Sequence, residues 1–375
     1  MTKHTRGLGW AGAITLALVV AWAMPERSVV STLTLGDPAI QSIGALTFGP
    51  ENILIVGDSK SASVVALDVM DTDAPGDAQI NVGKIDAKIA GLLGVEPSAV
   101  TVHDMAVHPA THNVYLSVSR GQGPEAQPVL LKVGKDGALS EIDLKAIRFS
   151  KAALANAPAA DATDNRGRSL RTNAITDLAY RDGKVYVAGL SNEEFASSLR
   201  QLDFPFKASM TSSSLEIFHV AHGQYETHAP VRTFMPYDLG GQAHILAAYT
   251  CTPLVAFQVS GLQDGAHVKG TTVAELGYGN TPLDIVSYTR DGQDYLLLAN
   301  TNRTVMKIKA SDLVGAASLT EPLQGDAITA GVAYTALPRV GVLQLDTMGD
   351  EAVVMLQREV ADGSLSLRSY GTDWF

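Results

Sequence analysis

Cysteine is almost absent from this sequence, since Cys251 is the only one among 375 residues. A chain with one thiol cannot close a disulfide within itself, so burial and strand pairing must hold the fold. Aromatic residues make up 6% and charged residues 18%, whereas 46% are hydrophobic and 34 residues are glycines. This composition indicates a folded globular chain with many tight turns, and it excludes a disulfide scaffold and extensive disorder.

Positive charge is scarce as well. Lysine and arginine number 28 against 39 aspartates and glutamates, which gives a formal net charge of −11. An acidic chain is repelled by polyanions, so we expect no nucleic acid partner. The sequence also lacks the GxSxG, GxxxxGK[ST], GxGxxG and CxxCH patterns of common hydrolase, nucleotide and haem sites.

Long apolar runs are limited to the N-terminus. Lys3, His4 and Arg6 precede an uncharged run at residues 8–23 that ends in Ala21-Trp22-Ala23, the small-x-small pattern of a signal peptidase site. We therefore expect residues 1–23 to be a signal peptide and residues 24–375 to be one domain in the periplasm or outside the cell. The alternative is an uncleaved membrane anchor, and only in that case do we expect membrane contact.

A repeated strand-turn-strand pattern is the main signal in the remainder. Four copies are clear and two are weaker, separated by roughly 50 to 75 residues, which suits four short strands and their loops. The clear copies are residues 45–58, 104–120, 177–190 and 284–300, and the weaker ones are residues 233–249 and 344–356. We therefore predict an all-β fold, a six-bladed β-propeller with short helical insertions.

Several details accompany this fold prediction. Residues 85–93 and 192–202 read as helical insertions, and residues 152–171 as a long loop; seven blades remain open if that loop contains strands. A propeller must close its ring, because an unpaired sheet edge invites aggregation. We expect residues 29–35 and 365–370 to share the closing blade.

The units HDMAVHPATHNVYLSVSR (103–120) and TDLAYRDGKVYVAGLSN (176–192) resemble the exported bacterial propellers of the NHL-like, YVTN-like and lactonase-like group. The resemblance covers nearly all of the chain after residue 23 and concerns the fold. Its calcium-dependent lactonases and arylesterases hold a metal at the axis through Glu, Asn and Asp from different blades. The resemblance thus implies that Asp104, Asp177 and Asp284 are candidate calcium ligands, although Ala45 stands where the first blade would supply an acid.

The innermost strands of a propeller line its axis, so matching positions of the copies should meet there. These positions are Ala45, Asp104, Asp177, Thr233, Asp284 and Gln344. Three aspartates in one ring suit a hard cation such as Ca²⁺. The alternative is that each aspartate caps backbone N–H groups within its own blade.

The ends of the second strands form a more varied ring, which suits an anionic or polyhydroxylated small molecule. The candidate ligand-binding residues are Asp58, Arg120, Asn192, Thr250, Asn302 and Arg303, with Arg232 just before an inner strand. A solvated rim without a ligand is the alternative.

Cys251 lies just past a buried strand, and we expect His103, His228 and His244 at comparable blade edges. A thiolate with imidazoles suits copper or zinc. A buried, inert thiol is the alternative. We expect His108, His112, His219 and His222 on the surface.

Three functions follow, and the sequence does not decide whether the protein is an enzyme. The first is binding of a small molecule or a periplasmic protein at the channel mouth. The second is a calcium-type hydrolase with His103 as general base beside a metal-bound water. The third is a copper-binding or redox-partner propeller centred on Cys251.

Overall fold

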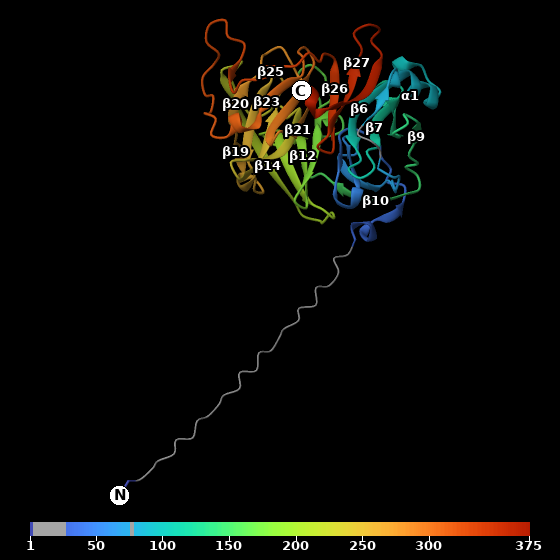
Figure 1. Ribbon diagram of the computed structural model, residues 1–375, viewed down its shortest axis with the longest axis horizontal. Helices are drawn as coiled ribbons and strands as arrows, with labels where there is room; N and C mark the ends of the chain where they lie inside the picture. Colours follow the sequence, from blue (N-terminus) through green and yellow to red (C-terminus); the bar gives the residue numbers. More distant parts are fainter. Residues whose placement is uncertain (3–27, 76–78) are drawn as a thin grey trace.

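A computed structural model describes residues 1–2, 28–75 and 79–375 of the chain. Its strands gather into six sheets set around one axis like the blades of a propeller (Figure 1). The described residues therefore confirm the six-bladed β-propeller. Most of the expected signal segment, residues 1–23, lies outside them, as does the expected cleavage near Met24. Among the described residues, no helix is long and apolar enough to cross a membrane.

Blades are numbered by the position of their innermost strand along the chain, and strands are given from the axis outward. Blade 1 contains β2 (Leu46–Phe48), β3 (Leu54–Asp58), β4 (Ser63–Asp68), β10 (Ile147–Ala153) and β1 (Thr34–Gly36). Blade 2 contains β6 (Val100–Val107), β7 (Val114–Arg120), β8 (Gln127–Val133) and β9 (Leu139–Glu141). Blade 3 contains β11 (Asp177–Arg181), β12 (Lys184–Leu190), β13 (Ser197–Asp203), β14 (Met210–His219) and β15 (Gln224–Glu226), and β19 (His267–Lys269) pairs in parallel with β14.

The other three blades follow the same plan. Blade 4 contains β16 (Thr233–Leu239), β17 (Gln242–Ala248), β18 (Pro253–Gln258), β20 (Thr271–Glu275) and β24 (Ala330–Gly331). Blade 5 contains β21 (Pro282–Arg290), β22 (Gln293–Asn300), β23 (Met306–Lys309) and β25 (Thr335–Ala336). Blade 6 contains β26 (Val342–Met348), β27 (Ala352–Arg358), β28 (Leu365–Gly371) and β5 (Asn81–Val82).

The second strand of each blade is apolar over most of its length because a neighbouring blade packs on each of its faces. In β7, Val114, Leu116 and Val118 belong to a buried cluster shared with blade 6. Tyr115, between them, belongs to a different cluster shared with Leu54 of blade 1. Successive side chains of a strand point to opposite faces, so one strand serves two interfaces. Each such buried side chain contributes roughly 1.5–3 kcal/mol.

The order of the blades around the ring differs from their order along the chain. The inner strand β6 of blade 2 contacts β26 of blade 6 and β2 of blade 1, and β2 contacts β11 of blade 3. The ring therefore runs 6, 2, 1, 3, 4, 5 and back to 6. After β4 the chain crosses to blade 6, adds β5 as its outermost strand, builds blade 2, and returns to blade 1 as β10.

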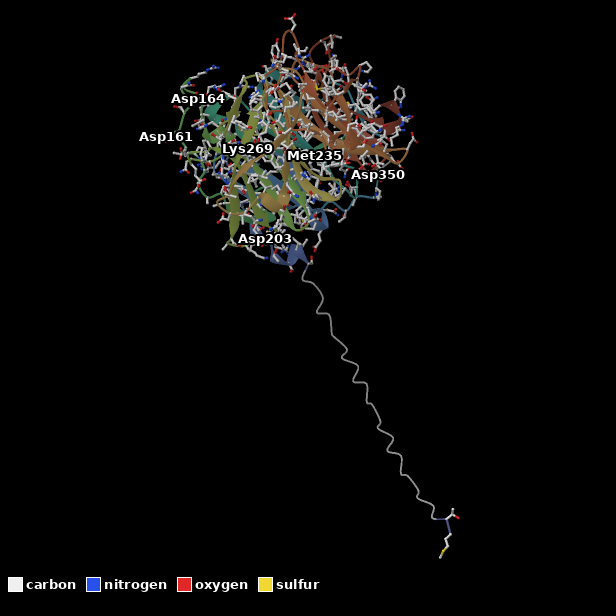
Figure 2. The ribbon with its side chains drawn as sticks, turned by 90° about the vertical axis from the view of Figure 1, so that its left-hand side faces the viewer. Asp161, Asp164, Asp203, Met235, Lys269 and Asp350 are labelled. Atoms are coloured by element: carbon white, nitrogen blue, oxygen red, sulfur yellow. The ribbon has the colours of Figure 1, made fainter. Side chains whose placement is uncertain are left out.

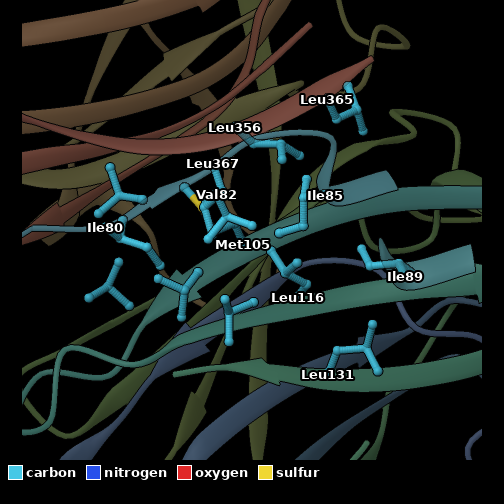
Figure 3. Packing of buried hydrophobic residues seen from close by; sticks show 14 of the residues in the cluster. Ile80, Val82, Ile85, Ile89, Met105, Leu116, Leu131, Leu356, Leu365 and Leu367 are labelled. Atoms are coloured by element: carbon cyan, nitrogen blue, oxygen red, sulfur yellow. The ribbon is translucent and has the colours of Figure 1, made fainter. Parts of the chain in front are cut away.

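Our prediction that residues 29–35 and 365–370 share the closing blade is wrong. β1 pairs with β10 in blade 1, whereas β28 pairs with β5, where Leu367 lies opposite Val82. The β5 strand spans two residues and has no strand pattern, so it could not be predicted from the sequence. Ile80, Val82 and Ile85 fill the junction of blades 6 and 2 with apolar side chains (Figure 3).

The insertions match the predictions in part. Helix α1 (Ile85–Leu93) has the predicted bounds and buries Ile85, Ile89, Ala90 and Leu93 on one face. The helix predicted at residues 192–202 is wrong, because β13 begins at Ser197 and pairs with strands on both sides. Residues 154–171 form the expected loop, and its Asp161 and Asp164 stand at the edge of the molecule (Figure 2).

Candidate functional site

A channel follows the propeller axis, with a cavity of about 480 Å³. All six innermost strands line it, and four of its lining residues are aspartates: Asp104, Asp177, Asp284 and Asp346. A larger cavity of about 1160 Å³ lies on blade 6, beside Asn81 and Arg368, and shares no lining residue with the channel. Of these two cavities, the channel is the one that collects acidic groups from several blades.

The four channel aspartates make the same pair of hydrogen bonds. One carboxylate oxygen accepts the backbone N–H of the following residue, at 2.7 or 2.8 Å. The other accepts a backbone N–H from the innermost strand of the next blade in the ring. These links run from Leu46 to Asp104 (2.7 Å), from Phe234 to Asp177 (2.8 Å), from Leu345 to Asp284 (2.6 Å) and from Val107 to Asp346 (2.6 Å). The aspartates therefore join neighbouring blades at the axis.

These bonds agree with the interpretation of Asp104, Asp177 and Asp284 as caps of backbone N–H groups, and they extend it to the neighbouring blade. Their donor atoms are not among the described groups of three or more that lie close enough to share a metal ion. The distances therefore give the calcium-type interpretation no support. Blades 1 and 4 carry Ala45 and Thr233 at the matching position, so the links from blade 1 to 3 and from blade 4 to 5 are missing.

Asp346 is a channel residue that our sequence reasoning missed. We placed Gln344 at the matching position of blade 6, and Asp346 is two residues further along the same strand. Side chains at positions i and i+2 of a strand point to one face, so this spacing was the available signal. Its partner Val107 is correspondingly two residues beyond Met105, which places this link one level deeper in the channel.

The channel carboxylates are harder to ionise than ordinary ones. Burial raises the pKa of Asp177 and of Asp346 to about 6, although their backbone N–H donors act in the opposite direction. Burial also raises the pKa of Asp104 and Asp284 well above the usual range, and the other channel carboxylates add to the effect. The ring therefore carries less than four negative charges near neutral pH.

His103 and Ser119 form a pair on the face where inner strands begin and second strands end. His103 Nε2 lies 2.7 Å from Ser119 Oγ, and Gln344 Nε2 donates to the His103 carbonyl at 2.9 Å. His103 is reachable by solvent, yet the surrounding protein disfavours its charged form and lowers its pKa. A neutral imidazole in contact with a hydroxyl is the arrangement of a base and a nucleophile. In the described part of the chain, no carboxylate contacts its Nδ1.

Two predicted rim residues have structural roles instead. Asp58 is fully buried, and its carboxylate accepts hydrogen bonds from Gln41, Ser42 and Ser61. Asn302 donates from its side chain to the Gly279 carbonyl and from its backbone N–H to Asn280 Oδ1. These bonds hold loops in place, so we no longer count Asp58 and Asn302 as ligand-binding candidates.

Arg232 and Arg303 differ from these two. They lie on neighbouring blades at the face where inner strands begin and second strands end. The Nε atom of each guanidinium is buried and has no hydrogen-bond partner among the described residues. Burial lowers the pKa of Arg232, and none of the described carboxylates forms an ion pair with either arginine. Buried donors without a partner are costly, and they are expected where a ligand supplies the acceptor.

The remaining rim candidates Arg120, Asn192 and Thr250 are exposed at the ends of second strands. They lie on the same face as Arg232 and Arg303. Their side chains are therefore available to a ligand, although nothing in the described contacts singles them out.

The histidine partners predicted for Cys251 are wrong. His244 lies near the start of β17 and Cys251 follows the end of that strand, so the two are at opposite ends of it, and His103 belongs to blade 2. His228 contacts Thr227 and is not grouped with the thiol. Cys251 lies instead with His219 and His222. We expected these two on the surface together with His108, but His219 and His108 are buried.

Comparisons with known proteins assign this chain to no family. No family model matches the chain, and no curated protein matches it. The β-propeller domain of Cps50 (Swd1) from Myceliophteria thermophila is 11% identical, covers 88% of this chain and 83% of its own, and has a TM-score of 0.39. The PQQ-bound aldose sugar dehydrogenase from Streptomyces coelicolor is 12% identical, with coverages of 90% and 96% and a TM-score of 0.33. At these values no function is transferred.

Proposed function

We propose that the protein is an exported propeller that binds a small anionic or polyhydroxylated molecule at the mouth of its channel. The observation that carries this proposal is the pair of buried, unpartnered Nε donors on Arg232 and Arg303. A carboxylate, phosphate or hydroxyl oxygen would complete these donors, and hydrogen bonds with a charged partner are the stronger ones.

The channel beneath the mouth favours a ligand that stays at the rim. A ring of four carboxylates repels an anion that enters deeply, but their raised pKa values reduce the repulsion at the mouth. The exposed side chains of Arg120, Asn192 and Thr250 supply further polar groups around the same opening. A sugar acid satisfies both requirements, because it joins one anionic group to several hydroxyls.

The test is calorimetric titration of the mature chain with gluconate, citrate and inorganic phosphate. We expect saturable binding of at least one of them, weakened at least tenfold by Arg232→Ala and by Arg303→Ala. Arg148→Ala is the matched control, because Arg148 is exposed on the outer strand β10 of blade 1 and should not matter. Equal affinity of all three variants, or no saturable binding of any probe, would contradict the proposal.

Export is part of the same proposal and rests on residues 1–23. Expression of the full chain in a bacterium with a periplasm, followed by N-terminal sequencing, tests it. A mature chain that begins near Met24 in the periplasmic fraction is the expected result. An intact N-terminus in the membrane fraction would favour the anchor.

A second candidate function is ester or lactone hydrolysis, favoured by the 2.7 Å contact between His103 Nε2 and Ser119 Oγ. In this version the Ser119 hydroxyl passes its proton to His103 Nε2 as Oγ attacks the carbonyl carbon, and His103 returns that proton to the alcohol oxygen as the ester bond breaks. Water then hydrolyses the acyl-serine and releases the acid. Turnover of p-nitrophenyl acetate that is lost in Ser119→Ala but survives chelation would support it. Turnover that is lost on chelation would instead favour the calcium-type hydrolase with Asp104, Asp177 and Asp284.

A further inference from the structure

A second cluster of reactive side chains lies between blades 3 and 4, away from the channel. His219 ends β14 of blade 3, His222 lies in the turn that follows, and Cys251 lies in the turn between β17 and β18 of blade 4. Each residue offers one donor atom, and the three atoms lie within 4.8 Å of one another. Among the described residues, no other three or more His, Cys, Asp or Glu side chains place their donor atoms this close together.

Glu226 fixes which imidazole nitrogens are free. Its two carboxylate oxygens contact His219 Nδ1 at 2.8 Å and His222 Nδ1 at 2.5 Å. A carboxylate accepts hydrogen bonds at its oxygens, so a neutral imidazole in either position donates from Nδ1 and carries its lone pair on Nε2. A carboxylate behind a ligating imidazole is the usual arrangement at a metal site.

The free nitrogen of His219 is a second and independent sign. The side chain is 3% exposed, and its Nε2 is buried without a hydrogen-bond partner among the described residues. A buried polar atom without a partner costs about 1–3 kcal/mol. The ring centroids of His219 and His222 lie 3.8 Å apart, so their Nε2 atoms are close enough to bind the same ion.

The backbone at Cys251 is held in an unusual conformation. Cys251 and Thr252 have φ values of +67° and +61°, in the left-handed region that residues other than glycine rarely occupy. The Cys251 N–H donates to the Asn280 carbonyl at 2.7 Å, and the Thr252 hydroxyl donates to the Gly277 carbonyl at 2.8 Å. Contacts with the next blade therefore hold the turn that carries the thiol. Strained backbone that surrounding contacts maintain is common at functional sites.

We propose that His219 Nε2, His222 Nε2 and Cys251 Sγ bind one Zn²⁺ or copper ion between blades 3 and 4. Two imidazole nitrogens and one thiolate are ligands that both ions prefer. The thiolate and the Glu226 carboxylate together balance the charge of a divalent ion. Bond lengths of about 2.0–2.3 Å require the donors to close by roughly 1 Å. His222, 48% exposed, can make this movement and gives the ion a path from solvent.

The site also leaves a coordination position open. Three protein ligands with a free fourth position are typical of zinc sites that hold a water, and two histidines with one cysteine are typical of copper sites that transfer electrons. The two ions share the ligand set, so the experiment must separate them.

The test uses the mature chain, purified without a histidine tag, reduced and freed of metal with a chelator. Titration with Zn²⁺ should give one equivalent, and Co²⁺ and Cu²⁺ should each give the charge-transfer absorption of a bound thiolate. Comparison of the Zn²⁺ and copper affinities then identifies the favoured ion. No stoichiometric binding of either ion by the folded chain would overturn the proposal.

Variants locate the ion. Cys251→Ser should abolish the charge-transfer band, and His222→Ala should weaken binding at least tenfold without harming the fold, because His222 is exposed. Glu226→Gln should weaken binding about tenfold to a hundredfold by releasing both rings. His228→Ala is the matched control, since His228 is a nearby exposed histidine outside the cluster. Unchanged binding in both His222→Ala and Cys251→Ser would show that the ion lies elsewhere and would refute this site.

Discussion

The side chain of Asp346 in blade 6 accepts the backbone N–H of Val107 in blade 2 at 2.6 Å, across 239 positions of the chain. Its other oxygen accepts the N–H of Thr347 at 2.7 Å. One carboxylate thus joins blade 6 to blade 2, which are neighbours in the ring although they are far apart in the sequence. The channel aspartates hold the ring together at its axis, where each blade contributes only its innermost strand.

Replacing Asp346 by Asn should destabilise the fold by about 1–3 kcal/mol, because an amide NH₂ would face a backbone N–H that needs an acceptor. Urea unfolding measures the change. Asp161→Asn is the control, since Asp161 is exposed in the loop, and it should alter stability by less than about 0.5 kcal/mol. Equal stability of the two variants would mean that the link from blade 6 to blade 2 contributes nothing.

Stability should depend on pH through Asp177. Burial raises its pKa from 3.8 to about 6, so between these values the folded chain holds a proton that the unfolded chain has lost. The stability that this proton provides is complete below pH 3.8 and is lost as the pH rises through 6. The Asp177→Asn variant cannot ionise, so the wild-type chain should lose stability relative to it between pH 4 and pH 7.

Urea unfolding of both proteins at several pH values in this range checks that expectation. Groups away from the channel are present in both chains and cancel in the difference. Asp104 and Asp284 lose the repulsion of Asp177 in the variant, which acts in the same direction. A difference that stays constant or moves the other way would show that the channel does not raise this pKa.

Gly189 should tolerate no side chain. A Cβ at this position of β12 would lie 2.2 Å from the Ala174 carbonyl oxygen, which belongs to the backbone and cannot rotate away. Gly189→Ala should therefore destabilise the chain by several times the roughly 0.5–1 kcal/mol that separates glycine from alanine in a regular element. Gly91→Ala in α1, where nothing lies within 4 Å, should be neutral or stabilising. Thermal unfolding compares the two, and similar midpoints would contradict the close approach.

The sequence predicted the blades because their signal is local. Alternating apolar residues and turns at Asp182-Gly183 or Asp291-Gly292 mark each strand pair without reference to distant residues. The sequence did not predict the ring order, because the two residues Asn81–Val82 form a strand only by pairing with β28, where Leu367 lies opposite Val82. The error at residues 192–202 has the same cause: pairing on both sides of β13 decides its structure over its helical appearance.

The candidate site residues were likewise predicted where their signal is local and missed where it depends on distant segments. Asp104, Asp177 and Asp284 were found because they repeat with the blades, whereas Asp346 departs from the repeat by two residues. The cluster at Cys251 was misassigned, because its partners come from another blade. A local sign was present in His219-Val220-Ala221-His222, a pair of histidines three residues apart that we assigned to the surface. The order of the blades around the ring decides which residues of two blades come together. Spacing along one strand does not reveal that order.

The crossing of the chain from blade 1 to blade 6 has a consequence for synthesis. A ribosome releases β5 long before β28 exists, and their contact between Asn81 and Arg368 spans 287 positions. Blade 1 is completed by β10, so blades 1 and 2 emerge together as one early unit with two open flanks. One flank is covered as blade 3 follows, but the other must wait exposed until the last blade is made. The nascent chain therefore presents an apolar surface for most of its translation, which is the kind of surface that chaperones bind.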